Sequence, residues 1–581
     1  MGASVGVDVG GTFTDLVAVV DGELVTAKVP SVRGSEACGI GAALRASGVG
    51  EVDVLAHGTT VATNALLERR GARTALVTTE GFRDVIEIGR QARASLYDLA
   101  AHHPAPLVPR ELRFTVRERM GPDGVLVPLD EGSLSAAVEA VRAAGVDAVA
   151  VCLLFSFLHP DHERRVGETV RAALPGTRVS LSVELLPEFR EYERCSTTVA
   201  NAYLAPALSA YLAEIEPSPL VMQSSGGVVD AATAAERPAA CVLSGPAAGV
   251  AGAAFVAGLA RARDVLTFDM GGTSTDVAAV LGGSAQVTAQ SVVGGVPIRF
   301  PMADIHTIGA GGGSIAWLDD GGALRIGPRS AGASPGPACY GLGGEEPTVT
   351  DANLVLGRLQ DGAVLGGEIR LDRSLAERAL ERLGMDAPEA AEGVIRVVDA
   401  NMAQALRVVS VERGIDPRGL ALVAFGGAGP LHACSLAEQL GIERVLVPRA
   451  SGVLSALGLA VADLRRDYVG WDAQVDLPGA GVTRYVDARY PGQSHELTIE
   501  EGADFHAAHE QRYGFRLDGE PEIVTRRIVA TVSRPRPELP AGGGERVEGP
   551  AVVELPGATC LVPAGWAGEP DGYGTLVLER T

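Results

Sequence analysis

DVGGTFTD at residues 8–15 and DMGGTSTD at residues 269–276 share six of their eight positions. Each copy follows a short apolar run of the strand type and precedes a second one. These second runs end in residue pairs typical of tight hairpin turns: Leu16–Val20 before Asp21-Gly22, and Val277–Leu281 before Gly282-Gly283. Both stretches therefore predict two strands joined by a glycine turn. A repeat of this kind indicates two lobes of similar architecture within one chain.

The repeated glycine turns have the chemistry of a polyphosphate site. Asp8 and Asp269 stand at strand ends, where a carboxylate can hold Mg²⁺, usually through water. Glycines let backbone N–H groups approach phosphate oxygens where a Cβ would obstruct, and hydroxyls add neutral donors. We expect catalytic roles for Asp8, Asp269, Thr12 and Thr273, and phosphate contacts from Gly10, Gly11, Thr12, Thr14, Gly271, Gly272, Thr273 and Ser274. The alternative is a pair of structural hairpins in a duplicated domain, which leaves the hydroxyl-rich turns unexplained.

Strand and helix patterns alternate through most of the chain, which predicts α/β architecture. A third glycine-rich loop, Gly426–Pro430, lies between a strand at Leu420–Phe425 and a helix that ends at Leu440. From about residue 470 the pattern changes to short β-like runs separated by Gly and Pro clusters. We therefore predict three domains: a first lobe at 1–200, a second lobe at 201–469, and a separate β-rich domain at 470–581.

Composition excludes several classes of partner and site. A formal net charge of −23 repels nucleic acid and anionic membranes, so neither is expected as a partner. The seven cysteines are scattered, which argues against zinc ribbons and secreted disulfide scaffolds. The first residues lack a signal-peptide pattern, so we expect a cytoplasmic protein. The chain has one lysine, Lys28, and it follows no glycine-rich loop, which excludes a Walker A motif.

Seven longer motifs resemble those of the hydantoinase/oxoprolinase family, A (large) subunit, and together they extend over most of the chain. They occur here as VGVDVGGTFTD (5–15), HGTTVATNALLERRG (57–71), SGPAAGV (244–250), DMGGTSTDVA (269–278), IGAGGGSIAW (308–317), SPGPACYG (334–341) and FGGAGPLHA (425–433). The family includes N-methylhydantoinases, 5-oxoprolinases and related subunits of acetone and acetophenone carboxylases.

The resemblance implies an actin/Hsp70/sugar-kinase-like fold with duplicated nucleotide-binding lobes. It also implies ATP and Mg²⁺ as cofactors, with a second divalent metal possible, and an adenosine-side loop that includes Gly426, Gly427 and Pro430. The implied activity is ATP-dependent hydrolysis of a cyclic amide by phosphoryl activation of its carbonyl, together with a hydantoinase B-type subunit. In this reading the transfer depends on positioning and charge neutralisation rather than on a strong nucleophile.

Other histidines and carboxylates leave two interpretations open. Asp304 and His306 lie on one face of an expected strand, where they could bind a metal or form a structural hydrogen-bonded pair. His57 and His432 could contact a ligand, although their positions favour a capping or core role for His57 and a helix-start role for His432. Alternative functions are an ATP-dependent ketone carboxylase subunit, a nucleotide-switched binding protein and, less well supported, a sugar kinase.

One region departs from the family pattern. Family members have a longer, helix-containing stretch between a segment like DLRRDYV (463–469) and one like RYPGQ (489–493). Only about twenty residues join the two segments here. We expect any effect of this difference to fall on the partner interface and leave the phosphate turns intact.

Overall fold

The computed structural model describes residues 3–11, 13–20, 22–31, 34–365, 369–471, 473–536 and 538–581. Both repeated turns lie where β-hairpins were predicted. The first hairpin comprises β1 (Ala3–Val9) and β2 (Phe13–Val20), and the second comprises β13 (Val265–Met270) and β14 (Thr275–Leu281). β1 buries its apolar side chains at alternate positions, whereas β13 is buried at every position except Asp269, as expected for a strand covered on both faces.

The two hairpins begin equivalent sheets. In the first lobe the strand order is β3-β2-β1-β4-β11, with β4 parallel to β1 and β11 parallel to β4. In the second lobe the order is β15-β14-β13-β25-β26, with β25 parallel to β13 and β26 parallel to β25. These strands are β3 (Glu23–Pro30), β4 (Val52–Gly58), β11 (Leu220–Met222), β15 (Ser284–Ala285), β25 (Ala421–Phe425) and β26 (Arg444–Val447). The matching order confirms the expected α/β fold with duplicated lobes.

Two short helices pack between the lobes. They are α9 (Ser244–Leu259) and α14 (Leu454–Val461), and an added Cβ on Gly458 would lie 1.9 Å from the Ala248 carbonyl oxygen. Small residues therefore allow the helix backbones to approach closely. Val17 of the first lobe and Val265 of the second belong to the same buried apolar cluster as these helices, so the two sheets share a core.

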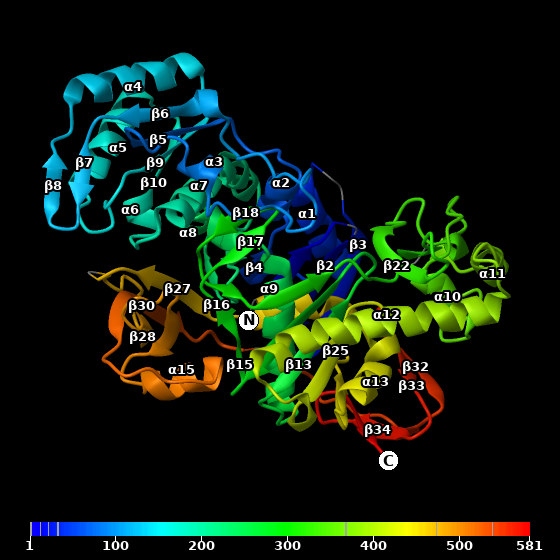
Figure 1. Ribbon diagram of the computed structural model, residues 1–581. Helices are drawn as coiled ribbons and strands as arrows, with labels where there is room; N and C mark the ends of the chain where they lie inside the picture. Colours follow the sequence, from blue (N-terminus) through cyan, green and yellow to red (C-terminus); the bar gives the residue numbers. More distant parts are fainter. Residues whose placement is uncertain are drawn as a thin grey trace.

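A separate parallel sheet is inserted in the first lobe, between β4 and β11. Its strand order is β10-β9-β5-β6, and Figure 1 shows it as the cyan region apart from the two lobes. Helices α4 (Glu131–Ala144) and α5 (Asp161–Ala173) pack against it, and α7 (Glu191–Ala213) connects it to the lobe. The strands are β5 (Thr74–Thr79), β6 (Arg113–Val116), β9 (Ala148–Cys152) and β10 (Arg178–Leu181).

The second lobe carries further elements on the outer side of its sheet. The long helix α12 (Ala387–Val409) and the helix α13 (Gly429–Leu440) pack against it with α10 (Val349–Val355) and α11 (Arg373–Glu381). β20 (Ile305–Ile308) pairs with β14 on the side away from β13. No helix among the described residues is both long and apolar enough to cross a bilayer.

The predicted boundary at residue 200 is wrong. It falls inside α7, and β11 continues the first sheet after it, so the first lobe extends beyond Leu220. A strand of three residues carries no local signal of the sheet that it joins, because its pairing partner, β4, lies some 160 residues earlier in the chain.

The prediction of a separate domain at 470–581 is also wrong. The region is rich in strands, but β28 (Gly481–Arg489), β29 (Leu497–Glu500) and β30 (Glu522–Val532) extend the first sheet through β27 (Leu464–Val469). By contrast, β34 (Trp566–Pro570) and β35 (Leu576–Arg580) extend the second sheet from β26. Without these strands, β27 would be an edge of the first sheet and β26 an edge of the second, each with unpaired backbone groups. The last hundred residues cover both of these edges.

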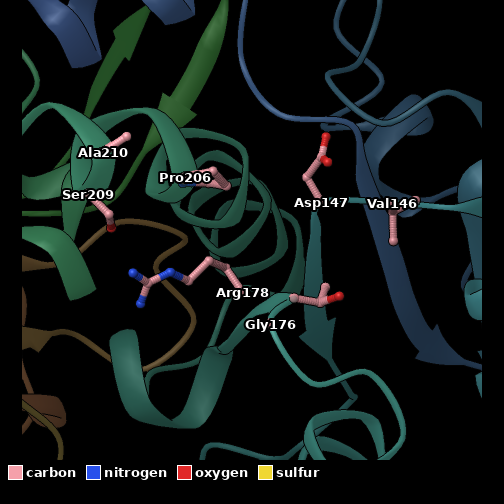
Figure 2. A pocket seen from close by; sticks show the side chains of 8 residues that line it. Val146, Asp147, Gly176, Arg178, Pro206, Ser209 and Ala210 are labelled. Carbon is pink, nitrogen blue, oxygen red and sulfur yellow. The ribbon is translucent and has the colours of Figure 1, made fainter.

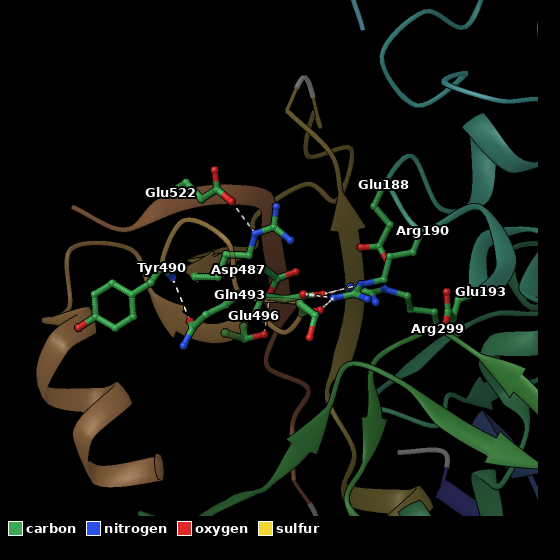
Figure 3. Close-up of polar contacts among 12 residues, drawn as sticks. Glu188, Arg190, Glu193, Arg299, Asp487, Tyr490, Gln493, Glu496 and Glu522 are labelled. Carbon is green, nitrogen blue, oxygen red and sulfur yellow. Dashed lines mark hydrogen bonds and ion pairs between the residues drawn. The ribbon is translucent and has the colours of Figure 1, made fainter. Parts of the chain in front are cut away.

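A buried ionic network attaches the first of these extensions to the rest of the chain (Figure 3). Glu188, before α7, accepts hydrogen bonds from Arg299 and from Arg527 of β30, the latter at 2.8 Å. Arg527 also binds Asp487 of β28 at 2.8 Å, and Arg299 binds Glu496 at 2.6 Å. These side chains are nearly inaccessible to solvent, so each charge depends on its partners.

Candidate functional site

Each repeated turn closes with the same backbone hydrogen bond. The Gly10 N–H donates to the Phe13 carbonyl at 2.9 Å, and the equivalent Gly271 N–H donates to the Ser274 carbonyl at 3.1 Å. At the base of each turn two aspartates are cross-strand partners: Asp8 with Asp15, and Asp269 with Asp276. The predicted equivalence of the two turns therefore extends to backbone geometry and to a paired carboxylate.

The four carboxylates form one electrostatic site. The pKa of Asp8 is raised to about 7, chiefly by burial and also by the negative charge of Asp15. Burial likewise raises the pKa of Asp269 to about 8, with added repulsion from Asp276, Asp8 and Asp15. The two turns lie near a common region, because Lys28 binds Asp15 of the first hairpin and also donates to the Gly452 carbonyl of the second lobe. Carboxylates held close together disfavour their ionised forms until a cation binds.

Glycines line the approach to both carboxylates. An added Cβ would lie 2.8 Å from Asp8 Oδ1 at Gly58 and 3.4 Å from it at Gly245. The Asp8 Oδ1 atom is itself buried and has no hydrogen-bond partner among the described residues. An orphaned carboxylate oxygen beside two glycines fits a bound cation or its water, which would supply the missing partner.

The third glycine loop contacts the second turn directly. The Ala428 N–H donates to the Met270 carbonyl at 3.0 Å, and an added Cβ on Gly426 would lie 2.3 Å from Asp269 Oδ1. Gly427 is exposed, whereas Pro430 is buried in the first turn of α13. The structure thus brings the loop at 426–430 against the loop at 269–276. Pro430 shapes the start of the helix and has no surface with which to contact a ligand in this conformation.

The hydroxyl groups of the two turns differ in orientation. Thr273 is exposed and Ser274 is half-buried, so both are available at the surface of the second turn, beside Gly272. Thr14 is fully buried and its hydroxyl shares a hydrogen bond of 3.1 Å with Ser31, so the predicted phosphate contact from Thr14 is wrong. Side chains alternate along β2, and this one points away from the Asp15 face. Thr12, expected at the tip of the first turn beside the exposed Gly11, lies outside the described residues.

Lys28 is a site residue that the sequence reasoning missed. It lies on β3, where it is the cross-strand partner of Asp15, and its Nζ is 2.7 Å from Asp15 Oδ1. Its positive charge lowers the pKa of Asp8 and of Asp269 against the larger effect of burial. The signal was present: a two-residue turn at Asp21-Gly22 pairs position 15 with position 28.

Asp304 and His306 do not lie together in a metal site. Arg413 binds both oxygens of Asp304, one of them at 2.9 Å, which satisfies the carboxylate with an ion pair. His306 lies on β20 opposite Val277. Among the residues that the structure describes, no three His, Cys, Asp or Glu side chains converge in a group that could hold a metal ion. The arrangement favours a structural role for Asp304, although with Arg413 rather than His306 as its partner.

The two other histidines considered from the sequence are buried. His57 Nδ1 lies 3.0 Å from the Val7 carbonyl and Nε2 lies 2.8 Å from the Tyr211 hydroxyl. Burial lowers the pKa of His57 to about 4, so the ring is neutral and supports the strand that carries Asp8. His432, at the start of α13, lies 2.7 Å from Asp399 and is fully buried. Both are core residues in this structure.

A surface hollow of about 530 Å³ lies apart from the repeated turns, between α7 and the inserted sheet (Figure 2). Its charged residues, Asp147 and Arg178, are exposed, and Ser209 faces it from α7. None of its lining residues belongs to the three glycine loops. The loops and their carboxylates therefore remain the candidate site.

Two family models match the chain: one described as Hydantoinase/oxoprolinase at residues 194–468, and one described as Hydantoinase/oxoprolinase N-terminal region at residues 4–174. The alpha subunit of a caprolactamase from Pseudomonas jessenii is 37% identical, and the alignment covers 99% of this chain and 98% of the relative. The gamma subunit of an acetophenone carboxylase from Aromatoleum aromaticum is 37% identical over 86% of this chain and 73% of its own.

A solved structure is similar over the same length. The crystal structure of the ATP-dependent caprolactamase from Pseudomonas jessenii has a TM-score of 0.89 to this chain, at 34% identity, with 99% of each chain covered. The sequence alignment with its alpha subunit runs over 685 positions, more than the 581 residues of this chain, so the relative carries segments that this chain lacks. A shortened segment was expected between β27 and β28. The residues that the structure describes there, 470–471 and 473–480, contain no helix.

Proposed function

Because this chain belongs to the hydantoinase/oxoprolinase family, we propose that it hydrolyses a cyclic amide at the expense of ATP. The observation that carries the proposal is the pair of equivalent aspartate-glycine turns, one from each lobe, which Lys28 links by its contacts with Asp15 and the Gly452 carbonyl. The ATP-dependent caprolactamase, similar over 99% of both chains, supports a lactam or a related cyclic amide as the substrate.

The residues present fit a nucleotide and a divalent cation. Asp8 and Asp269 would hold Mg²⁺, either directly or through water, and the unpartnered Asp8 Oδ1 supports this assignment. Backbone N–H groups of the two glycine turns, with the Thr273 and Ser274 hydroxyls, would bind phosphate oxygens. The exposed Gly427 would lie toward the adenosine side. We also propose a second divalent metal, to which we assign no protein ligands.

The protein contributes positioning and charge neutralisation. ATP supplies, when bound, a phosphoryl group that makes the amide oxygen a good leaving group. The two turns would bind the polyphosphate, and the Asp8 and Asp269 carboxylates would hold the cation that neutralises its charge.

A ketone carboxylase subunit is the second candidate function. The relative from Aromatoleum aromaticum, named as an acetophenone carboxylase gamma subunit, supports it at the same identity as the caprolactamase subunit. The nucleotide site would serve either reaction, because both begin with activation by ATP. The names of both relatives as subunits also support a partner chain, which we propose to be of the hydantoinase B type, and seven free thiols support a cytoplasmic location.

The decisive experiment measures release of ADP and phosphate by the purified chain, with and without a B-type subunit. Hydantoins, lactams, 5-oxoproline, ketones and bicarbonate are supplied one at a time with Mg·ATP. ATP consumption that depends on a cyclic amide supports the hydrolase. Consumption that requires both a ketone and bicarbonate supports the carboxylase, and no substrate-dependent turnover across the panel contradicts both.

A further inference from the structure

The single lysine of the chain lies at the nucleotide site, on the boundary between the two lobes. Lys28 comes from β3 of the first lobe, and its Nζ is 2.7 Å from Asp15 Oδ1 and 5.1 Å from the centre of the Phe13 ring. Phe13 directly follows the first glycine turn. The same Nζ donates to the Gly452 carbonyl of the second lobe at 3.3 Å.

Gly452 places Lys28 beside the third loop as well. The neighbouring residue, Ser451, accepts a hydrogen bond from the Gly426 N–H at 3.0 Å. The lysine therefore lies between the first glycine turn and the loop that contacts Asp269. About a third of its side chain is exposed, so it can reach a ligand and a reagent in solution.

The two lobes differ at this position. In the first lobe the row of cross-strand partners runs Asp8, Asp15 and Lys28. In the second lobe it runs Asp269, Asp276 and Thr307, and the Thr307 hydroxyl donates to the Asp276 carboxylate. Each row thus contains a pair of aspartates, and of these two rows the one in the first lobe also contains a lysine. An asymmetric ligand such as a nucleotide would meet this positive charge at the first lobe.

We propose that Lys28 binds the polyphosphate of the nucleotide, exchanging part of its contact with Asp15 for phosphate oxygens. This inference rests on the proposed function, because it assumes that ATP is the ligand. An ammonium group is a compact donor suited to phosphate, and it adds charge that backbone N–H groups lack. In a chain of formal charge −23, this cation at the site reduces the repulsion that a triphosphate would meet.

Calorimetry with Mg·ATP and with adenosine tests the proposal. Lys28→Gln is expected to bind ATP roughly 10- to 100-fold more weakly than the wild type, the range for a lost charged hydrogen bond, with adenosine affinity unchanged. Lys28→Arg keeps the charge and should lie between the two. Arg418→Gln removes an exposed cation paired with Asp416, away from the site, and should match the wild type. A purely structural bridge between lobes would instead weaken ATP and adenosine alike.

A labelling experiment on the wild-type chain does not depend on any variant. Pyridoxal 5′-phosphate condenses with the Lys28 amine with loss of water, and borohydride reduces the imine to a stable secondary amine that mass spectrometry locates. Saturating Mg·ATP should protect Lys28, and adenosine should not. Labelling that ATP does not slow, or equal ATP affinity in Lys28→Gln, overturns the role of Lys28. Failure of the wild type to bind ATP would overturn the proposed function and this inference together.

Discussion

The backbone of Gly426 lies so close to Asp269 that an added Cβ would come within 2.3 Å of the carboxylate oxygen Oδ1. Gly426 also has a φ of +77°, which side chains rarely adopt. The third loop and the second turn are thus fitted to each other at a position that admits no side chain.

Gly426→Ala is therefore expected to displace Asp269 and to lower ATP turnover by at least about tenfold, because a displacement of this size misplaces a group that acts by position. Gly414→Ala is the matched control: its φ is +76°, and an added Cβ there meets no atom within 4 Å. Steady-state ATPase assays of both variants separate the collision from backbone strain. Equal loss of activity in the two would contradict the role given to the contact.

Asp269→Asn should stabilise the free protein while it removes activity. Between the ordinary pKa of 3.8 and about 8, the folded state retains the Asp269 proton and the unfolded state does not, so this group lowers stability as pH rises. At pH 8 the amide should raise the free energy of unfolding by about 1–2 kcal/mol, less than the pKa shift alone implies, because Asp269 is half-buried and solvent screens part of the effect. Thermal denaturation without nucleotide checks this, with ATPase activity measured on the same sample. A lower midpoint would refute it.

Binding of Mg·ATP should strengthen as pH rises through the neutral range. At about pH 6 both Asp8, with a pKa near 7, and Asp269, with a pKa near 8, retain protons that a cation must displace. Affinity should rise by up to about a hundredfold per pH unit below pH 7, where both protons are displaced, by up to about tenfold between the two pKa values, and level off above the higher one. Calorimetry in buffers of different ionisation enthalpy would count the protons released, and adenosine without Mg²⁺ serves as a pH-independent control. A flat profile for Mg·ATP would show that neither carboxylate meets the cation.

The parts of the site that could be predicted from sequence are those set by local chemistry. The two turns are continuous segments with a repeated pattern, so Asp8 and Asp269 could be paired before any fold was known. Thr14 was misassigned because the hydroxyl was counted without its strand face, although alternation from Asp15 would have turned it inward. Lys28 was set aside for lacking a neighbouring glycine loop, and only strand register brings it to Asp15.

The parts that could not be predicted depend on pairing across long separations. The strands after residue 480 join sheets whose open edges are formed by β27 and β26, and no local pattern says which edge a strand will cover. Arg413 similarly reaches Asp304 from 109 residues away, which explains why the sequence suggested a metal ligand at that carboxylate.

Asp304→Asn tests that assignment. If the carboxylate serves as the partner of Arg413, the variant should lose stability and keep its affinity for Mg·ATP, because the ion pair includes none of the residues proposed to bind the nucleotide. The double variant Asp304→Asn with Arg413→Gln should lose less than the sum of the two single changes. A variant that unfolds at the wild-type temperature but no longer responds to divalent cations would restore the metal interpretation.

Glu188 is expected to hold the extension formed by β28–β30 on the first lobe. Its carboxylate is inaccessible to solvent and accepts from two arginines, so Glu188→Ala leaves Arg299 and Arg527 short of a counter-charge in a buried place. Such a change costs about 3–5 kcal/mol.

Limited proteolysis of Glu188→Ala should then cut within residues 473–536 before it cuts the lobes, because the extension detaches first. Glu522→Ala removes an exposed partner of Arg489 in the same extension and should cost at most about 1 kcal/mol. Equal protease resistance of the two variants would show that backbone pairing of β27 with β30, rather than the ionic network, holds the extension in place.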